Sequence, residues 1–131
     1  MGLIASVRVE GISGHAQRIR AGSHELASDE PRGSGGTDLG PSPYGLVLSG
    51  LGACTSITLR MYAERKGWDV GVIRVHLRHF KEARGEHIER EISFSGPLEP
   101  EKTRRLLEIA EKTPVTLTLK TGIAISTKLA P

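Results

Sequence analysis

The sequence predicts an α+β fold, and three observations predict it. Residues near both ends alternate between apolar and polar with a period of two, which is typical of strands. Residues 43–66 form a long apolar helical run, and residues 100–112 form a shorter one. The elements therefore come in blocks, as a β-meander, a long helix, a β-hairpin, a second helix and a C-terminal strand, rather than in regular βαβ units. Because 131 residues can enclose one core, we expect 1–131 to form a single domain.

The N-terminal part predicts three short strands and a loop. Residues 3–10 alternate and predict a half-buried strand, whose apolar face carries Leu3, Ala5, Val7 and Val9. Extended pieces near 15–21 and 23–28 complete the meander. The stretch 31–43 is rich in Gly, Pro and Ser and predicts a loop. It lacks the Gly-Lys-Ser/Thr ending of a phosphate-binding loop, so we interpret it as a connection to the helix.

The long helix is expected to begin at Ser42-Pro43 and to stop at Gly67. Serine can accept hydrogen bonds from the first free N–H groups, proline suits the first turn, and glycine commonly follows the last. Up to Ile57 the run is apolar on nearly every side, through Leu46, Val47, Leu48, Leu51, Ala53 and Cys54. A helix that is apolar all round is buried all round. We therefore expect a second subunit to supply part of its cover, in a homodimer.

Residues 70–80 and 86–95 predict two strands joined by a turn at 81–85. In the second strand Arg90 shares a face with Ile88, Ile92 and Phe94. A charged side chain on an apolar face needs a partner or a route to solvent. We interpret Arg90 as an edge or interface residue.

The last third of the chain predicts a helix and two final strands. In the helix 100–112, an inward stripe is formed by Thr103, Leu106, Leu107 and Ala110. Pro114 is expected to end this helix. The alternating segments 115–119 and 123–129 then predict the last strands.

Composition and charge favour an ordinary soluble protein. The net charge of +3 is interspersed along the chain, so we expect a solvated surface rather than binding to nucleic acid. Arg8 and Glu10 come too early for a signal-peptide core. No stretch approaches the roughly 18 apolar residues of a membrane span, so we expect no membrane partner. The single cysteine suits a reducing cytosol, and we expect a cytoplasmic protein.

The one candidate for covalent chemistry is Cys54. A lone cysteine excludes an intrachain disulfide and a multi-cysteine metal site. His76 and His79 lie on opposite faces of a predicted strand, so we expect no metal site and no cofactor. From composition alone, Cys54 is either a small buried hydrophobe or a nucleophile. A reactive thiol at mid-helix needs a cation or a base brought by another segment.

Three stretches together resemble the OsmC-like branch of the OsmC/Ohr superfamily, the osmotically inducible and organic-hydroperoxide-resistance proteins. These are Asp29-Glu-Pro31, Gly35-Gly-Thr-Asp-Leu-Gly-Pro-Ser-Pro-Tyr44, and the central motif Leu51-Gly-Ala-Cys-Thr-Ser-Ile-Thr-Leu-Arg-Met-Tyr-Ala-Glu-Arg-Lys-Gly-Trp68. The similarity extends to Leu106-Leu-Glu-Ile-Ala-Glu-Lys-Thr-Pro-Val115 and covers most of the chain.

The resemblance implies an intertwined homodimer with the two long helices at its centre and active sites at the subunit interface. It also implies thiol-based reduction of organic hydroperoxides, a chemistry of the oxidative stress response. In that chemistry a thiolate attacks the peroxide and becomes a sulfenic acid, a second cysteine condenses with it, and an external thiol restores both. Cys54 falls on the family's peroxidatic cysteine.

The chain departs from the family pattern at the resolving and activating positions. The family's resolving Cys-Pro-Val-His stretch is replaced by Thr113-Pro-Val-Thr116. The glutamate that follows the helix-opening proline is replaced by Tyr44 and Gly45. The family's activating arginine comes from the N-terminal sheet region, where the candidates are Arg18, Arg20 and Arg32.

These departures leave two hypotheses for the function of the chain. In the first, the chain is at most a one-cysteine peroxidase that acts through Cys54 with an external thiol as reductant, because Thr113 replaces the resolving cysteine. In the second, it is a non-catalytic homodimer that binds a hydrophobic small molecule in the apolar interface cleft.

Overall fold

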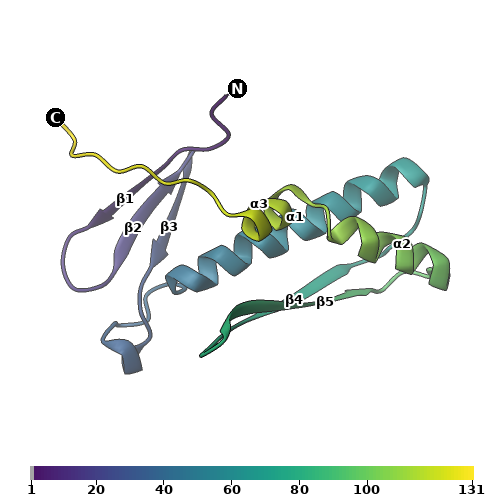
Figure 1. The fold of residues 1–131 in the computed structure, drawn as a ribbon, viewed down its shortest axis with the longest axis horizontal. Coiled ribbons are helices and arrows are strands. Elements are labelled where there is room, and N and C mark those ends of the chain that lie inside the picture. The colour runs from purple at the N-terminus through teal and green to yellow at the C-terminus, as the bar shows by residue number, and fades with distance from the viewer. Residues whose placement is uncertain (1) are drawn as a thin grey trace. The chain divides into compact units, whose positions relative to one another are not determined.

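The computed structural model describes residues 2–131 and has the predicted α+β composition. It contains five strands in two antiparallel sheets, three α-helices and one short 3-10 helix (Figure 1). The chain divides into two compact units, one up to Ser49 and the other Gly50–Pro131. The long helix α1 begins in the first unit and continues into the second.

The N-terminal unit contains a three-stranded meander of β1 (Val7–Gly11), β2 (Gln17–Ala21) and β3 (His24–Ser28). The register places Val9 opposite Ile19 and Ile19 opposite Leu26. The prediction of a half-buried strand over 3–10 is wrong in two respects, because β1 begins only at Val7 and all five of its residues are exposed. Alternation correctly identified a strand, but burial depends on what covers its apolar face.

The loop after β3 is organised by a buried carboxylate. Asp29 is 2% exposed and accepts hydrogen bonds from the N–H of Glu30 at 2.7 Å, the hydroxyl of Thr37 at 2.8 Å, and the N–H groups of Thr37 and Leu39 at 3.2 Å. Burial raises the pKa of Asp29, but these hydrogen bonds outweigh it and hold the pKa below its usual value. The predicted loop therefore has a fixed shape, which includes the 3-10 helix Arg32–Ser34.

Helix α1 has the predicted bounds, Pro43–Lys66. Ser42 Oγ accepts a hydrogen bond from the N–H of Gly45 at 3.1 Å, as an N-cap does. At the other end Gly67 has φ +70°, and the N–H of Trp68 donates to the carbonyl of Ala63 at 2.9 Å. This is the glycine-terminated pattern of a helix C-terminus.

Helix α1 is not buried on every side within one chain. Its buried side chains form a single stripe, with one residue per turn: Leu51, Thr55, Leu59 and Ala63. Ile57 is 59% exposed and Met61 57% exposed. Several apolar side chains of α1 therefore remain uncovered in the single chain, as expected, and their cover by a second subunit stays a prediction.

By length and composition, α1 is the one helix among residues 2–131 that could cross a bilayer. The expectation that no stretch approaches a membrane span is wrong by this criterion, because glycine, serine and threonine lower hydropathy only slightly. The core helix of a soluble protein meets the same criterion, and the buried stripe of α1 is that of a core helix.

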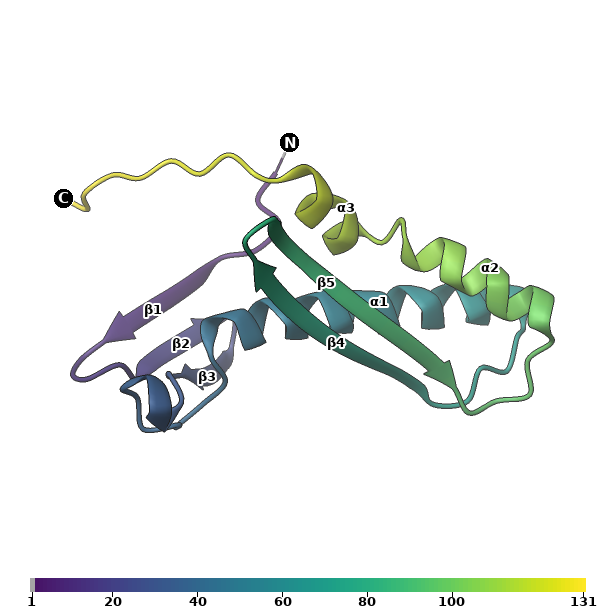
Figure 2. The same ribbon diagram turned by 60° about the horizontal axis from the view of Figure 1, so that its bottom comes forward.

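The C-terminal unit packs a hairpin and two helices with the main part of α1. Strands β4 (Ile73–Glu82) and β5 (Gly85–Phe94) run side by side and pair from Ile73–Phe94 to Glu82–Gly85 (Figure 2). The connecting turn is shorter than the predicted 81–85. Helix α2 is Pro100–Ala110. The core of this unit consists of Leu59, Ala63, Val70, Leu106 and Ala110.

The predicted C-terminal strands are wrong. Residues 114–121 form the helix α3 (Pro114–Thr121), and residues 122–131 form no strand in the described chain. Thr113 has an extended backbone and Pro114 occupies the first helical turn, which is a favourable helix start. Alternation of Val115, Leu117 and Leu119 over so few residues could not distinguish this helix from a strand. The order of the remaining elements is as predicted.

Candidate functional site

Cys54 lies on α1 within the C-terminal unit and is a free thiol of intermediate exposure. Its helical neighbour Thr55 belongs to the buried stripe, while Ala53 is exposed. No residue of the described chain 2–131 forms a disulfide with it. The predicted site residue is thus placed at the edge of the covered side of α1, where solvent reaches part of it.

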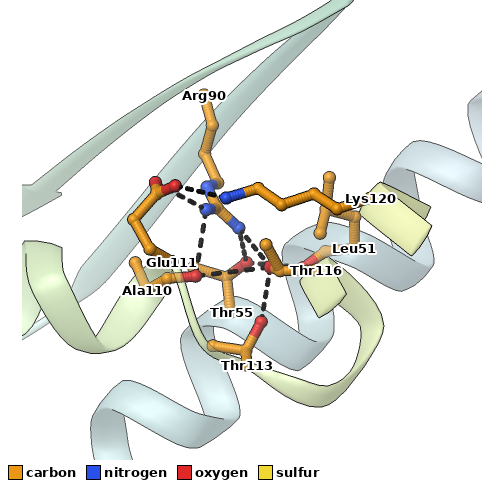
Figure 3. Close-up of polar contacts among 8 residues, drawn as sticks. All are labelled: Leu51, Thr55, Arg90, Ala110, Glu111, Thr113, Thr116 and Lys120. Carbon is orange, nitrogen blue, oxygen red and sulfur yellow. Dashed lines mark hydrogen bonds and ion pairs between the residues drawn. The ribbon is translucent and has the colours of Figure 1, made fainter. Parts of the chain in front are cut away.

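Beside this turn of α1, a buried guanidinium joins four elements (Figure 3). Arg90 on β5 has a side chain only 11% exposed. Its Nη1 donates to the hydroxyl of Thr55 at 3.0 Å and to the hydroxyl of Thr116 at 2.8 Å. Its Nη2 donates to the carbonyl of Ala110 at 3.0 Å and lies 3.4 Å from Oε2 of Glu111. The guanidinium therefore ties α1, β5, the end of α2 and α3 together.

Two threonines extend this network at the start of α3. The hydroxyls of Thr113 and Thr116 are 2.6 Å apart, and Thr113 is fully buried. Thr116 Oγ1 also lies within 3.3 Å of the Ala110 carbonyl, to which it can donate. Thr55 donates its own hydroxyl proton to the carbonyl of Leu51 at 2.7 Å. Every buried side-chain polar atom in the described chain has a hydrogen-bond partner, this network included.

A carboxylate closes the network at the surface. Glu111 Oε1 accepts a hydrogen bond from Lys120 Nζ at 2.6 Å, while its other oxygen faces Arg90. The hydrogen bond from Lys120 holds the pKa of Glu111 below its usual value, and the positive charge of Arg90 lowers it further. Lys120 belongs to α3, so this ion pair gives α3 a second polar attachment.

A separate polar cluster joins the end of α1 to α2. Arg105 Nε donates to the phenolic oxygen of Tyr62 at 3.1 Å, and this hydrogen bond lowers the pKa of Tyr62. Tyr62 also meets Trp68 edge to face, with ring centroids 5.6 Å apart. This cluster lies at the outer margin of the core, and the hydrogen bonds of Arg105 and Tyr62 do not reach the Arg90 network.

The candidate activating arginines belong to the N-terminal unit, whereas Cys54 belongs to the C-terminal unit. Arg18 and Arg20 lie on β2 and Arg32 in the 3-10 helix, all in the N-terminal unit. Arg20 pairs with Glu25 at 3.4 Å. Among residues 2–131, no group of three or more His, Cys, Asp or Glu side chains could hold a metal ion.

The interpretation of Arg90 as an edge or interface residue described only part of its environment. Arg90 does lie on an edge strand, because β4 and β5 form a two-stranded sheet. Its side chain also has partners inside the same chain, at Thr55 and Thr116, which lie 35 and 26 positions away in sequence. The sequence signal was an arginine on the apolar face of an alternating strand, between Ile88 and Ile92. That pattern required a partner but could not identify it.

The family model for the OsmC-like protein matches residues 35–128, which include α1, Cys54 and both threonines. The chain belongs to the OsmC-like family. The resemblance inferred from the central motif is confirmed. Among curated proteins no sequence matches this chain.

Solved structures share the OsmC-like fold. The OsmC-like protein of Mycoplasma pneumoniae superposes with a TM-score of 0.78 at 17% identity, over 92% of this chain and 89% of that one. The organic hydroperoxide resistance protein OsmC of Legionella pneumophila gives 0.69 at 17% identity, over 90% of each chain. The organic hydroperoxide resistance protein OhrB of Bacillus subtilis gives 0.61 at 24%, over 88% of this chain and 90% of that one. At these identities the comparisons establish the fold.

Proposed function

We propose that this OsmC-like chain is a single-cysteine peroxidase that reduces organic hydroperoxides through Cys54. The observation that carries the proposal is a free, partly exposed thiol on α1, within the segment that matches the family. Relatives with the same fold are organic hydroperoxide resistance proteins. A thiol that solvent reaches can meet a dissolved hydroperoxide, whereas a fully enclosed one cannot.

The proposed reaction has two stages. The Cys54 thiolate attacks the distal peroxide oxygen, the O–O bond breaks, and the alkoxide takes a proton to leave as an alcohol. Cys54 is oxidised to a sulfenic acid, and the hydroperoxide is reduced. One external thiol then displaces water and forms a mixed disulfide at Cys54. A second external thiol attacks this mixed disulfide, which restores the Cys54 thiol and releases the two external thiols as a symmetric disulfide.

An external thiol is needed because position 113 carries no sulfur. The threonine there is fully buried and hydrogen-bonded to Thr116. A hydroxyl cannot form a disulfide, so the two-cysteine cycle is not available to the chain. The reductant is therefore part of the proposal, and no cofactor is required.

The proposed assembly is a cytoplasmic homodimer in which a second copy covers the apolar side chains that α1 leaves exposed. Val47, Ile57 and Met61 are 42%, 59% and 57% exposed in the single chain. Exposed apolar side chains of this size on the longest helix are typical of an interface. A reducing compartment would keep Cys54 as a thiol between turnovers.

The test is chemical trapping. The reduced protein is treated with cumene hydroperoxide in the presence of a dimedone-type probe, and intact mass is measured. We expect one adduct per chain at Cys54 and none in the Cys54→Ser variant. Absence of an adduct, under conditions that label an active hydroperoxide resistance protein, would contradict the proposal.

A second candidate function is binding of a hydrophobic small molecule by a non-catalytic dimer. The observation that favours it is the replacement of the resolving pair by Thr113 and Thr116, together with Tyr44 and Gly45 in place of the expected glutamate. Native mass spectrometry of freshly purified protein distinguishes the two. A co-purified ligand without any sulfenic acid supports this candidate, whereas a clean apo dimer that also fails to bind fatty or aromatic probes contradicts it.

A further inference from the structure

The Arg90 network contains an ionised side chain that the proposed reaction does not use. Four of its hydrogen bonds reach residues on α1, α3 and the end of α2. Taking a guanidinium out of water is costly unless such partners compensate it. An arginine at this place is therefore expected to have a role that an aliphatic residue could not fill.

The geometry places the start of α3 beside the Cys54 turn. The same Nη1 of Arg90 donates to Thr55, the residue after Cys54, and to Thr116 in the first turn of α3. Both hydroxyls therefore lie within hydrogen-bond reach of one nitrogen atom. Thr113, bonded to Thr116 at 2.6 Å, is brought to the same region of α1.

Helix α3 has two polar attachments to the rest of its unit. Thr116 is the buried residue of α3, and Leu117 and Leu119 are 47% and 42% exposed. The attachments are the Thr116 hydroxyl, which accepts from Arg90 and meets Thr113, and the ion pair of Lys120 with Glu111. Because hydrogen bonds to a charged group are strong and directional, the guanidinium helps to fix where the start of α3 lies.

We propose that Arg90 is a positioning residue that holds position 113 against the Cys54-bearing turn of α1. The proposal rests on the proposed function, since it concerns the surroundings of the same thiol. In the natural chain this arrangement sets a threonine hydroxyl, and no thiol, in the region of α1 next to Cys54. Oxidised Cys54 is thereby left to an external thiol, which approaches from its solvent-exposed side.

The experiment introduces a thiol at position 113 and uses its disulfide formation with Cys54 to report how close the two positions are. In the Thr113→Cys variant, the azo oxidant diamide takes one hydrogen atom from each of two thiols and leaves a disulfide. The rate of disulfide closure between Cys54 and the new thiol is measured by mass spectrometry after alkylation. The same measurement is made in Arg90→Met and Arg90→Lys backgrounds. An Arg78→Met background is the matched control, because Arg78 pairs with Glu89 on the exposed face of the hairpin.

We expect rapid closure with Arg90 present and unchanged closure with Arg78→Met. We expect closure about tenfold slower or less complete with either Arg90 substitution, since the hydrogen bond that joins Arg90 to α3 and those that join it to α1 and the end of α2 are lost or weakened. Equal closure rates in folded Arg90 variants and their parent would overturn the proposal. So would the absence of a disulfide in Thr113→Cys alone.

A second pair of variants covers the case in which the Arg90 substitutions fail to fold. Thr116→Ser keeps the hydroxyl that accepts from Arg90, and Thr116→Val keeps the shape without it. We expect closure to be preserved in the first and slowed in the second, and equal rates in both would contradict the positioning role. Because diamide needs no peroxidase activity, these results are independent of whether hydroperoxides oxidise Cys54.

Discussion

At the residue scale, two charged side chains each form several hydrogen bonds and so organise their surroundings. Asp29 orders the loop before α1 through four hydrogen bonds. Arg90 joins the start of α3 to the turn that bears Cys54. In both cases the charge is compensated by donors or acceptors of its own unit, so the network fixes local geometry.

The Asp29→Asn variant is expected to be less stable than the natural chain at neutral pH, because the amide accepts fewer of these hydrogen bonds. The folded pKa of Asp29 lies below its unfolded value of 3.8. The carboxylate therefore contributes stability above pH 3.8, and this contribution is lost as the pH falls through the folded pKa.

Urea unfolding of both proteins between pH 7 and pH 3 measures this difference. The gap between their midpoints is expected to be widest at neutral pH and to narrow in acid. A gap that stays constant down to the lowest pH would show that the ionised carboxylate is not the stabilising group.

At the element scale, α1 carries both core residues and the free thiol of Cys54. Leu59 is fully buried and packs with Ala63, Val70, Leu106 and Ala110. Gly52 lets β4 approach closely, since a Cβ there would lie 2.9 Å from a methyl group of Leu77. Apolar packing of α1 against its neighbours therefore fixes the position of Cys54, in addition to the polar network around Arg90.

Leu59→Ala is expected to lower the free energy of unfolding by about 2–5 kcal/mol, as deletion of a fully buried leucine does. Chemical denaturation followed by circular dichroism measures the change. Leu107→Ala on α2 is the control, because Leu107 is 45% exposed and its truncation should cost little. Equal losses in the two variants would contradict the assignment of the core.

The sequence predicted these elements where it contained a local signal. The bounds of α1 followed from Ser42, Pro43 and Gly67, whose backbone roles need no tertiary information. The helix α3 was missed because alternating apolar residues resemble a strand over so short a segment. The partners of Arg90 could not be predicted, since they lie far away in sequence and no short-range pattern links them.

At the scale of the whole molecule, the single chain leaves several large apolar side chains exposed. On α1 they include Val47, Ile57 and Met61, and in the C-terminal segment Ile123 and Ile125. Exposure of this kind is unfavourable in water and is usually relieved by association. The proposed homodimer accounts for it without requiring a different partner.

Ile57→Arg is expected to shift the protein from dimer to monomer, because burying an unpaired charge at an interface is strongly unfavourable. Sedimentation velocity at micromolar concentration measures the change. Arg84→Glu, in the exposed turn between β4 and β5, is expected to leave the assembly unchanged. A well-folded monomer of the natural chain under these conditions would contradict the proposed assembly.

The proposed function requires that Cys54 completes a catalytic cycle with an external thiol. Intact-mass measurement after one equivalent of cumene hydroperoxide, followed by a limiting amount of a small monothiol, tests this directly. We expect one mixed disulfide per chain at Cys54, and excess thiol should return the protein to the mass of its reduced form. A protein that stays unmodified, or that proceeds to irreversible sulfinic or sulfonic acid without capturing the thiol, would contradict it.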